Sequence, residues 1–396
     1  MTNAELKKIT GASRALASAT ERVRDSFLAY LAAELRKDSQ KIIRANEKDV
    51  ARAKRKKLPA SFIERLTFTE KSIRHLEDEV KSLKRLDAGL GRAIEKRHKD
   101  GMTLEKVRVP LGVILVIYEA RPEVTVDVAA LCVKSGNAAI LKGGTEALET
   151  NKALYRSIKT ALKKAGLSSD SVRLVETGNR KVTNELLKRS DVIDLVIARG
   201  GYAMVKAVEA ASAIPVLAHS AGGARIYVDA SADLDMAERI LVNAKITKPA
   251  ACNSLDTILV DRAIAKTFVP RITKAMKAAG VEVSKKMDWD EETLGMKVGI
   301  TTVKGIQEAI VFTNTHGKKH SEGIIARDQK AIAKFMNSVD AAALFANAST
   351  RLHDGFVFGL GAEMGISTSK LHARGPVGLK ELTSYKWEVY GTGNLR

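Results

Sequence analysis

Apolar residues follow two different spacings along the chain, and the change falls near residue 100. Over residues 4–86 they recur every three or four positions with few β-branched runs, which is typical of amphipathic helices. Thr67 and Glu70 lie three positions apart ahead of Ile73, a pattern that predicts a capping box at the start of one helix. We therefore expect the first fifth of the chain to be helical.

A turn sequence marks the end of this helical part. The dipeptide Asp100-Gly101 separates the segment 94–98 from the alternating segment 103–109. Because Asp-Gly accepts the positive φ angles of a two-residue turn, the pattern predicts a projecting β-hairpin.

From residue 111 onward, short apolar runs alternate with segments of helical periodicity. The first expected strands are 113–118, 138–141, 172–175, 192–198 and 214–217, and the helices between them are 126–133, 146–164, 182–188 and 203–211. The alternation continues with strands 226–228 and 256–260, helices 234–245 and 267–279, and further signals to residue 345. Uninterrupted apolar strands between helices are typical of parallel sheets with both faces covered, so the predicted fold class is α/β with two such units.

The tail of the chain has a different composition. From residue 347 it is rich in Gly, Ser, Thr and His and has few helical periods, which predicts site-building loops and a terminal strand at 388–390. Two stretches, 347–355 and 370–376, combine hydrogen-bond donors, glycine and charge. They suit a zwitterionic or phosphorylated small molecule, and polar surface loops are the alternative.

Composition narrows the class of protein. The 396 residues suffice for two or three domains, and 45% hydrophobic with 28% charged residues is typical of a folded globular chain. The longest apolar stretch, 109–118, is about half of the ~20 residues that a membrane helix needs. With no signal-peptide core and only two cysteines, the chain is expected in a reducing cytoplasm, without a membrane segment or a disulfide framework.

The formal net charge of +20 is typical of proteins that bind nucleic acids. Half of this excess lies in the first 100 residues, and its densest run, Arg52–Lys57, falls in a helical pattern with no aromatic residue between the charges. Since bases would need such residues to stack on, we interpret the run as a solvated helix face.

Cys252 is the first candidate for chemistry, because its surroundings predict a loop. Pro249 disfavours a helix before it, and 256–260 has the pattern of a strand after it. A thiolate there, activated by Lys248 or by backbone amides, could attack an acyl carbon. The alternative is a buried, inert thiol, which is our interpretation of Cys132 on its apolar helix face.

Two glycine pairs follow predicted strands. The segments Lys142-Gly143-Gly144 and Arg199-Gly200-Gly201 each place a basic residue and two glycines between a strand and a helix. A phosphate-bearing cofactor can approach such a turn, although the pairs also serve as plain connections. No GxGxxG or Walker motif is present, and the seven histidines form no HExxH motif, so we predict no metal site.

Motifs in order along the chain resemble a known family. The segments that carry the resemblance are Val109-Pro-Leu-Gly-Val-Ile114, Tyr118-Glu-Ala-Arg-Pro122, Val124-Thr-Val-Asp127, Lys134-Ser-Gly-Asn137, Arg199-Gly-Gly201, Cys252-Asn253, Asn347–Arg351, Phe358-Gly-Leu-Gly-Ala-Glu363 and His372-Ala-Arg-Gly-Pro376. On these segments the chain is similar, from the first helices to Trp387, to gamma-glutamyl phosphate reductase, the proline-biosynthesis branch of the aldehyde dehydrogenase superfamily.

The resemblance implies a fold and a reaction. It implies an aldehyde dehydrogenase-like fold with two Rossmann-like parallel-sheet domains and an oligomerisation flap built from the hairpin and the C-terminal segment. Cys252, at the interface of the two domains, would attack the acyl carbon of L-glutamyl 5-phosphate and expel phosphate. NADPH would then reduce the thioester, which releases L-glutamate 5-semialdehyde and NADP.

The resemblance also implies roles for particular residues. Lys142 and Gly143 would contact the adenosine ribose region of the cofactor, and Arg199, Gly200 and Gly201 would lie near its phosphates. Substrate binding would fall to Arg121, Asn253, Ser349, Thr350 and Arg351. The segment His219–Gly223 lies where oxidising aldehyde dehydrogenases keep a glutamate base, and a reductase that activates no water can dispense with it.

Three positions depart from the family pattern. Glu123 stands where the reductases carry an oxyanion-hole Asn, Ala224-Arg225 replaces Cys-His, and the segment 284–293 is shorter. A carboxylate cannot donate a hydrogen bond to an oxyanion. We expect Arg121 to hold Glu123 aside and the Cys252 amide to stabilise the oxyanion.

These expectations imply a domain plan and partners. Residues 1–228 would form the cofactor-binding domain, with hairpin 94–110 joining the flap, 229–350 the catalytic domain, and 351–396 the C-terminal return. A homo-oligomer, dimer or tetramer, is expected, with a functional link to glutamate 5-kinase and no nucleic-acid or membrane partner. The alternatives are a semialdehyde dehydrogenase acting on a free aldehyde and a basic, non-catalytic nucleic-acid-binding homologue, which salt-dependent DNA retention would reveal.

Overall fold

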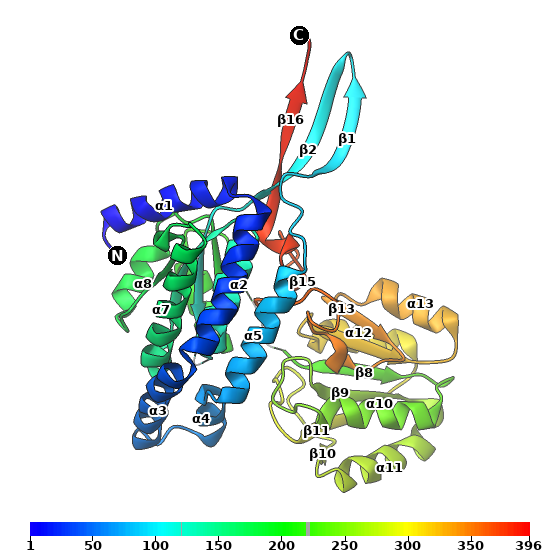
Figure 1. Cartoon of the computed structure of the whole chain (residues 1–396). Helices are drawn as coiled ribbons and strands as arrows, with labels where there is room; N and C mark the ends of the chain where they lie inside the picture. The colour runs from blue at the N-terminus through cyan, green and yellow to red at the C-terminus, as the bar shows by residue number, and fades with distance from the viewer. Residues whose placement is uncertain (120, 219–221) are drawn as a thin grey trace. The chain divides into compact units, whose positions relative to one another are not determined.

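The chain forms two compact units, and its C-terminal part contributes to both. The computed structural model describes residues 1–119, 121–218 and 222–396 (Figure 1). The first unit comprises Met1–Ala218, Gly359–Gly365 and Val377–Arg396, and the second comprises His219–Phe358 and Ile366–Pro376.

Five helices open the first unit, as the apolar spacing predicts. They are α1 (Asn3–Ser18), α2 (Glu21–Lys37), α3 (Ser39–Arg55), α4 (Ala60–Leu66) and α5 (Glu70–Lys84). The predicted capping box is wrong in its residues, because Thr69 caps α5 together with Ser72. Thr67 instead ends α4, where its hydroxyl donates to the Ile63 carbonyl at 2.7 Å.

The core of the first unit is a five-stranded parallel sheet. Its order is β5 (Val172–Leu174), β4 (Ala138–Gly143), β3 (Val113–Tyr118), β6 (Leu195–Arg199) and β7 (Val216–Ala218). The intervening helices are α6 (Glu123–Lys134), α7 (Leu148–Lys164), α8 (Arg180–Leu186) and α9 (Tyr202–Ala211). Strand β3 is buried along its whole length, as expected for a strand covered on both faces.

The register of this sheet brings two predicted positions, Gly143 and Arg199, together at its carboxyl edge. Tyr118, the last residue of β3, pairs with Gly143 on one side and with Arg199 on the other. Strand order reverses at β3, because β4 lies on one side of it and β6 on the other. Such a switch point is where open α/β sheets bind ligands.

The second unit holds a six-stranded parallel sheet. Its order is β10 (Glu282–Ser284), β11 (Lys297–Val303), β9 (Leu255–Asp261), β8 (Ala224–Val228), β12 (Ser321–Ile325) and β13 (Ala343–Ala346). Its helices are α10 (Leu234–Ile246), α11 (Arg262–Ala278), α12 (Ile306–His316) and α13 (Gln329–Ser338). Ile258 and Val260 pack into one core and Leu259 into another, so both faces are covered. The predicted α/β class with two parallel-sheet units is confirmed.

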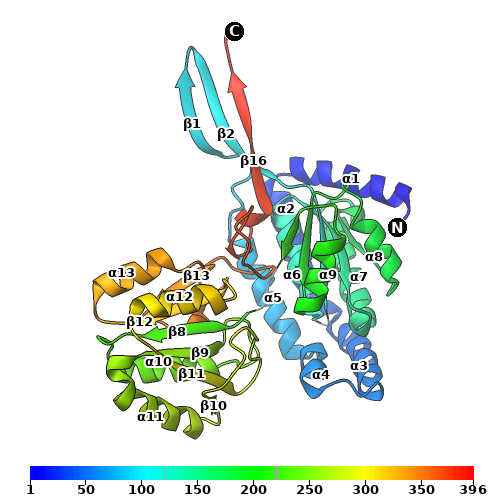
Figure 2. The same ribbon diagram turned by 180° about the vertical axis from the view of Figure 1, so that it is seen from behind.

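The predicted hairpin is also confirmed and gains a third strand. Strands β1 (Ala93–Lys99) and β2 (Met102–Pro110) flank Asp100 and Gly101, whose φ angles are 50° and 77°. Strand β16 (Thr383–Tyr390) pairs with β2 over its whole length and extends with it away from the rest of the first unit (Figures 1 and 2). We name this three-stranded sheet the flap. β16 begins before residue 388, and its mostly exposed side chains explain why no apolar pattern marked its start.

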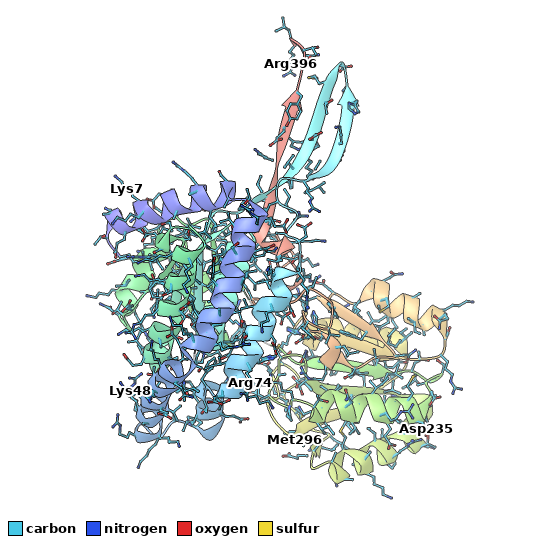
Figure 3. All side chains as sticks on the ribbon, viewed as in Figure 1. Lys7, Lys48, Arg74, Asp235, Met296 and Arg396 are labelled. Atoms are coloured by element: carbon cyan, nitrogen blue, oxygen red, sulfur yellow. The ribbon has the colours of Figure 1, made fainter. Side chains whose placement is uncertain are left out.

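Charged side chains lie on the outer faces of the N-terminal helices. Lys7 and Lys48 are exposed (Figure 3), and so is most of the basic run after Arg52. Arg52 itself turns inward to pair with the buried Asp49. No helix in the described part of the chain combines the length and apolarity needed to cross a bilayer.

Candidate active site

Cys252 lies on a turn between α10 and β9, so the predicted loop position is confirmed. Within the turn, the Ala251 N–H donates to the Lys248 carbonyl at 3.0 Å and the Ser254 N–H to the Ala251 carbonyl at 2.9 Å. Cys252 is half-buried, whereas Cys132 is fully buried in α6. Burial raises the pKa of the Cys132 thiol, which agrees with an inert packing role.

Two glycines support this nucleophile turn, which we define as residues 248–254. The Gly223 N–H donates to the Cys252 carbonyl at 2.6 Å. Gly222 lies so close that a Cβ on it would stand 2.5 Å from both Cα and Cβ of Cys252. Only glycine fits there, and a Gly-Gly pair just ahead of a strand is the signal in the sequence that marks this contact.

The segment after β13 lies against the same turn. Thr350, which is buried, donates its hydroxyl to the Asn253 carbonyl at 2.9 Å, and the Asn253 amide donates to the His353 carbonyl at 2.9 Å. The His353 ring in turn contacts the Ser321 hydroxyl at 2.8 Å. Asn253 and Thr350 therefore brace the turn from within, and Ser349 accepts the Arg351 N–H at the start of a short 3₁₀ turn.

Arg351 is the residue of this segment whose charge reaches the thiol. Its guanidinium is partly buried, and burial lowers the pKa of Arg351. The negative charges of Cys252 and Asp354 oppose that shift. Because this interaction is mutual, the guanidinium favours the thiolate form of Cys252.

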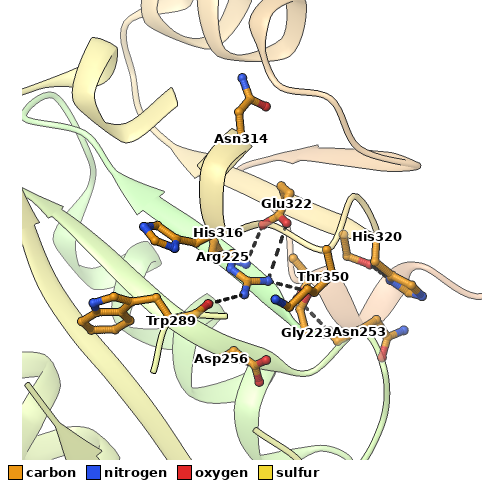
Figure 4. A network of polar contacts seen from close by, with 12 residues as sticks. Gly223, Arg225, Asn253, Asp256, Trp289, Asn314, His316, His320, Glu322 and Thr350 are labelled. Carbon is orange, nitrogen blue, oxygen red and sulfur yellow. Dashed lines mark hydrogen bonds and ion pairs between the residues drawn. The ribbon is translucent and has the colours of Figure 1, made fainter. Parts of the chain in front are cut away.

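Buried ionisable residues lie near Gly223 in the second unit, and Figure 4 shows Arg225, Asp256 and Glu322 among them. Burial raises the pKa of Asp256 to about 7, although the Thr293 N–H and the Lys245 and Arg225 cations oppose the shift. Burial also raises the pKa of Glu322 to about 8 and lowers that of Lys245 to about 8. None of these side chains was singled out by the sequence pattern, because their partners are far away in the chain.

Lys142 and Gly143 end strand β4, as predicted. Lys142 is 9% exposed, and its ammonium group donates to the Gly143 carbonyl at 2.9 Å. Burial lowers the pKa of Lys142, and the nearby Glu146 opposes the shift. Gly143 has no room for a Cβ, because the Asn151 amide and the Tyr118 ring pack against it.

Gly200 and Gly201, which follow β6, have an interaction partner that the sequence did not reveal. Glu119 accepts the Gly201 N–H at 3.0 Å at the start of α9, and its side chain fills the space beside Gly200. Arg199, at the end of β6, has a buried Nη1 atom without a hydrogen-bond partner among the described residues. Its charge opposes the rise that burial causes in the pKa of Asp127.

The remaining predicted positions lie in or near the same edge of the first unit. Arg121 precedes α6, and its N–H bonds to the Glu119 carbonyl. Glu123 begins α6 after Pro122, and its charge contributes to the raised pKa of Asp127. The segment His219–Gly223 was expected to lack a catalytic glutamate base. Its first three residues, His219 to Ala221, lie outside the described residues.

The contact between Gly222 and Cys252 predicts a steric effect on the nucleophile turn. Gly222→Ala adds a methyl group where Cys252 already stands, so we expect alkylation of Cys252 by iodoacetamide to slow by at least about tenfold, as a displaced reacting group would. Gly295→Ala is the control, because nothing lies within 4 Å of its added Cβ. Equal alkylation rates in both folded variants would contradict the assignment.

The buried Asp256 predicts a pH dependence of stability. A carboxyl whose folded-state pKa lies above its unfolded value stabilises the fold at acidic pH and loses this contribution as the pH rises through the folded value. The shift from 3.8 to about 7 is worth at most on the order of 4 kcal/mol. We expect the parent melting temperature to fall between about pH 5 and pH 7, and Asp256→Asn to flatten that fall.

The matched control for this measurement is Asp191→Asn. Asp191 is exposed, and its hydrogen bond from Arg189 lowers its pKa, so it is ionised throughout this range and the control should keep the parent slope. An Asp256→Asn curve parallel to that of the parent would show that Asp256 does not titrate near neutral pH.

Known proteins resemble this chain over nearly its whole length. Residues 2–295 match the model of the aldehyde dehydrogenase family. A gamma-glutamyl phosphate reductase from Carboxydothermus hydrogenoformans is 42% identical over 406 aligned positions, which cover 98% of each chain.

Solved structures agree with this placement. The crystal structure of gamma-glutamyl phosphate reductase from Thermotoga maritima has a TM-score of 0.96 and 37% identity over 99% of both chains. An acetylating aldehyde dehydrogenase from Geobacillus thermoglucosidasius, at 17% identity and a TM-score of 0.74, shares the fold. The chain therefore belongs to the aldehyde dehydrogenase family and, within it, to the gamma-glutamyl phosphate reductases.

Proposed function

We propose that this chain reduces L-glutamyl 5-phosphate to L-glutamate 5-semialdehyde, with release of phosphate, in the second step of proline biosynthesis from glutamate. The observation that carries the proposal is the half-buried Cys252 on its braced turn, whose thiolate interacts electrostatically with the Arg351 guanidinium. Its relatives, which bear the name gamma-glutamyl phosphate reductase, match almost the full length of the chain.

The proposed chemistry begins with the thiolate of Cys252. It attacks the acyl carbon of the mixed anhydride, the carbon–oxygen bond to phosphate breaks, and phosphate leaves with the electron pair. Because phosphate is a good leaving group, the step needs a stabilised oxyanion more than a strong acid. We assign that role to the Cys252 backbone amide, and the charge of Arg351 favours the thiolate form of Cys252.

The residues at the carboxyl edge of the first sheet fit a dinucleotide phosphate. Lys142 supplies a buried cation, and Arg199 presents a buried Nη1 atom without a partner in the described part of the chain. We propose that Lys142 and Gly143 hold the adenosine ribose of NADPH and that Arg199, Gly200 and Gly201 lie near its phosphates. When bound, the cofactor supplies the two electrons of the reduction.

Substrate binding is assigned to side chains that donate hydrogen bonds or carry positive charge. Arg351 supplies a cation for the substrate as well as for the thiolate, and Arg121, Ser349 and Thr350 complete the set. Asn253 acts through the backbone, because its amide donates to the His353 carbonyl. Glu123 stays outside the reacting groups, since a carboxylate there would repel the developing oxyanion.

We further propose that the enzyme works in the cytoplasm as a homo-oligomer, a dimer or tetramer, with a functional link to glutamate 5-kinase. The flap supports the oligomer, because it exposes large apolar side chains on an extended sheet. They are Ile94, Tyr385, Trp387 and Val389, with exposed fractions of 50%, 52%, 44% and 55%.

Loss of the nucleophile should abolish the reaction. Cys252→Ala leaves no covalent route, so we expect phosphate-dependent reduction of NADP by glutamate semialdehyde to fall by orders of magnitude while the melting temperature is kept. Cys132→Ala removes the buried thiol and should retain activity. Turnover of folded Cys252→Ala within about tenfold of the parent would remove Cys252 from the mechanism.

The cofactor assignment predicts a selective loss of affinity. Lys142→Ala removes a cation suited to the 2′-phosphate, so the dissociation constant of NADPH should rise more than that of NADH. Titration of the cofactor fluorescence measures both. Lys163→Ala, an exposed change in the last turn of α7, is the control. Equal weakening of both cofactors would show that Lys142 does not recognise the 2′-phosphate.

A further inference from the structure

Arg225 is a fully buried arginine behind the nucleophile turn. It is the second residue of β8, and the sheet register pairs it with Glu322 on β12. Its backbone N–H donates to Glu322 Oε2 at 2.7 Å, and its Nη1 lies 3.9 Å from Glu322 Oε1 (Figure 4). Both charges are thus taken out of water together.

The guanidinium reaches two further segments. Nη1 donates to the Gly223 carbonyl at 3.4 Å, and Nη2 donates to the Trp289 carbonyl at 3.1 Å. Arg225 therefore joins the residues ahead of β8, the loop between β10 and β11, and the start of β12. A planar group with several fixed donors suits such a junction.

Gly223 links this junction to the nucleophile. Its carbonyl accepts from Arg225, while its N–H donates to the Cys252 carbonyl at 2.6 Å. Its φ of 101° favours glycine, and a Cβ would collide with the Asp256 carboxylate. The peptide units on either side of Gly223 therefore have little freedom to move relative to Cys252.

The loop between β10 and β11 contacts Arg225 at Trp289, and nearer its C-terminal end further buried charges bind Thr293. The Thr293 N–H donates to Asp256 Oδ2 at 3.1 Å, and the Lys245 ammonium donates to the Thr293 carbonyl at 3.3 Å. The Glu292 carboxylate accepts the Gly222 N–H. Loop, glycine pair and nucleophile turn thus form one hydrogen-bonded assembly.

This arrangement is poorly explained by stability alone. Replacing a buried ion pair with apolar residues of similar volume is often neutral or stabilising. Here Arg225 Nε and Glu322 Oε1 are buried without a hydrogen-bond partner among the described residues, so the pair is not fully satisfied. What the guanidinium does provide is a fixed geometry for two backbone carbonyls.

We propose that Arg225 is a positioning residue of the active site: through the Gly223 carbonyl and the Trp289 carbonyl it fixes the backbone of the nucleophile turn. This rests on the proposed function, in which Cys252 is the nucleophile. Arg225 touches neither substrate nor thiol in this role. Its loss affects the rate of the covalent step more than substrate binding.

The test compares Arg225→Lys with Arg271→Lys. Lysine keeps the positive charge next to Glu322 but has a single ammonium group, which cannot reproduce the guanidinium fork. Arg271 is the matched control, because it also bonds two acceptors, Glu238 and Asp235 at 2.6 Å each, but on α11 and partly exposed. Three quantities are measured: the melting temperature, the pH profile of Cys252 alkylation by iodoacetamide, and kcat and KM for glutamate semialdehyde.

We expect folded Arg225→Lys to show an alkylation rate changed by at least about fivefold with a shifted pH profile. Its kcat should fall about tenfold with KM changed less than about twofold, and Arg271→Lys should match the parent. An unchanged alkylation rate and pH profile in folded Arg225→Lys would overturn the proposal. The alkylation arm needs no substrate, so it decides the role of Arg225 even if the parent does not turn over glutamate semialdehyde.

A second variant covers the case in which Arg225→Lys does not fold. Glu322→Gln keeps an acceptor for the Arg225 N–H but replaces the carboxyl group that faces the guanidinium with an amide that is neutral at every pH. We expect the same changes in alkylation and kcat, at smaller size. Failure of both variants to fold would assign the pair to stability and overturn the positioning role.

Discussion

The site depends on a contact between two backbones: Gly222 and Gly223 lie directly against Cys252. The hydrogen bond from the Gly223 N–H to the Cys252 carbonyl extends the pairing of β8 with β9 beyond the ends of the two strands. Cys252, the proposed nucleophile, is therefore attached to the sheet itself rather than carried on a free loop. A reactive thiol held by a rigid scaffold keeps its orientation without the cost of ordering a loop at each turnover.

The two sheets use their edges differently. In the first unit, the carboxyl ends of β3, β4 and β6 meet at the switch point, where Tyr118, Gly143 and Arg199 are neighbours in register. In the second unit, Cys252 precedes β9 and the glycine pair precedes β8, so the reactive group lies at the amino edge. The residues proposed to hold the cofactor and the proposed nucleophile Cys252 thus belong to different sheets.

The ionisable groups buried near Cys252 carry a desolvation penalty, because each loses its contact with water. Asp256, Glu322 and Lys245 are all less than 3% exposed, and burial shifts the pKa of each toward neutral pH. Such groups are partly neutral under working conditions, which lowers the desolvation penalty. These buried groups make the stability of the second unit depend on pH near neutrality.

Local patterns were sufficient for much of this protein. Apolar periodicity determined the helical N-terminal part and the α/β class, Asp100-Gly101 determined the hairpin, and Pro249 with the following strand placed Cys252 on a loop. These features depend on neighbours within a few residues, whose preferences act before any tertiary contact forms. The capping box predicted at Thr67 was wrong, because Thr69, two positions later, satisfies the same N-cap preference and caps α5 instead.

Only the tertiary structure decided which distant residues meet. Arg225 and Glu322 are 97 positions apart, and the Thr350 hydroxyl reaches the Asn253 carbonyl across the same separation. Glu119 occupies the turn at Gly201 because two strands lie side by side. Strand order and register create these contacts, and neither follows from periodicity, because every strand of a covered parallel sheet has the same apolar pattern.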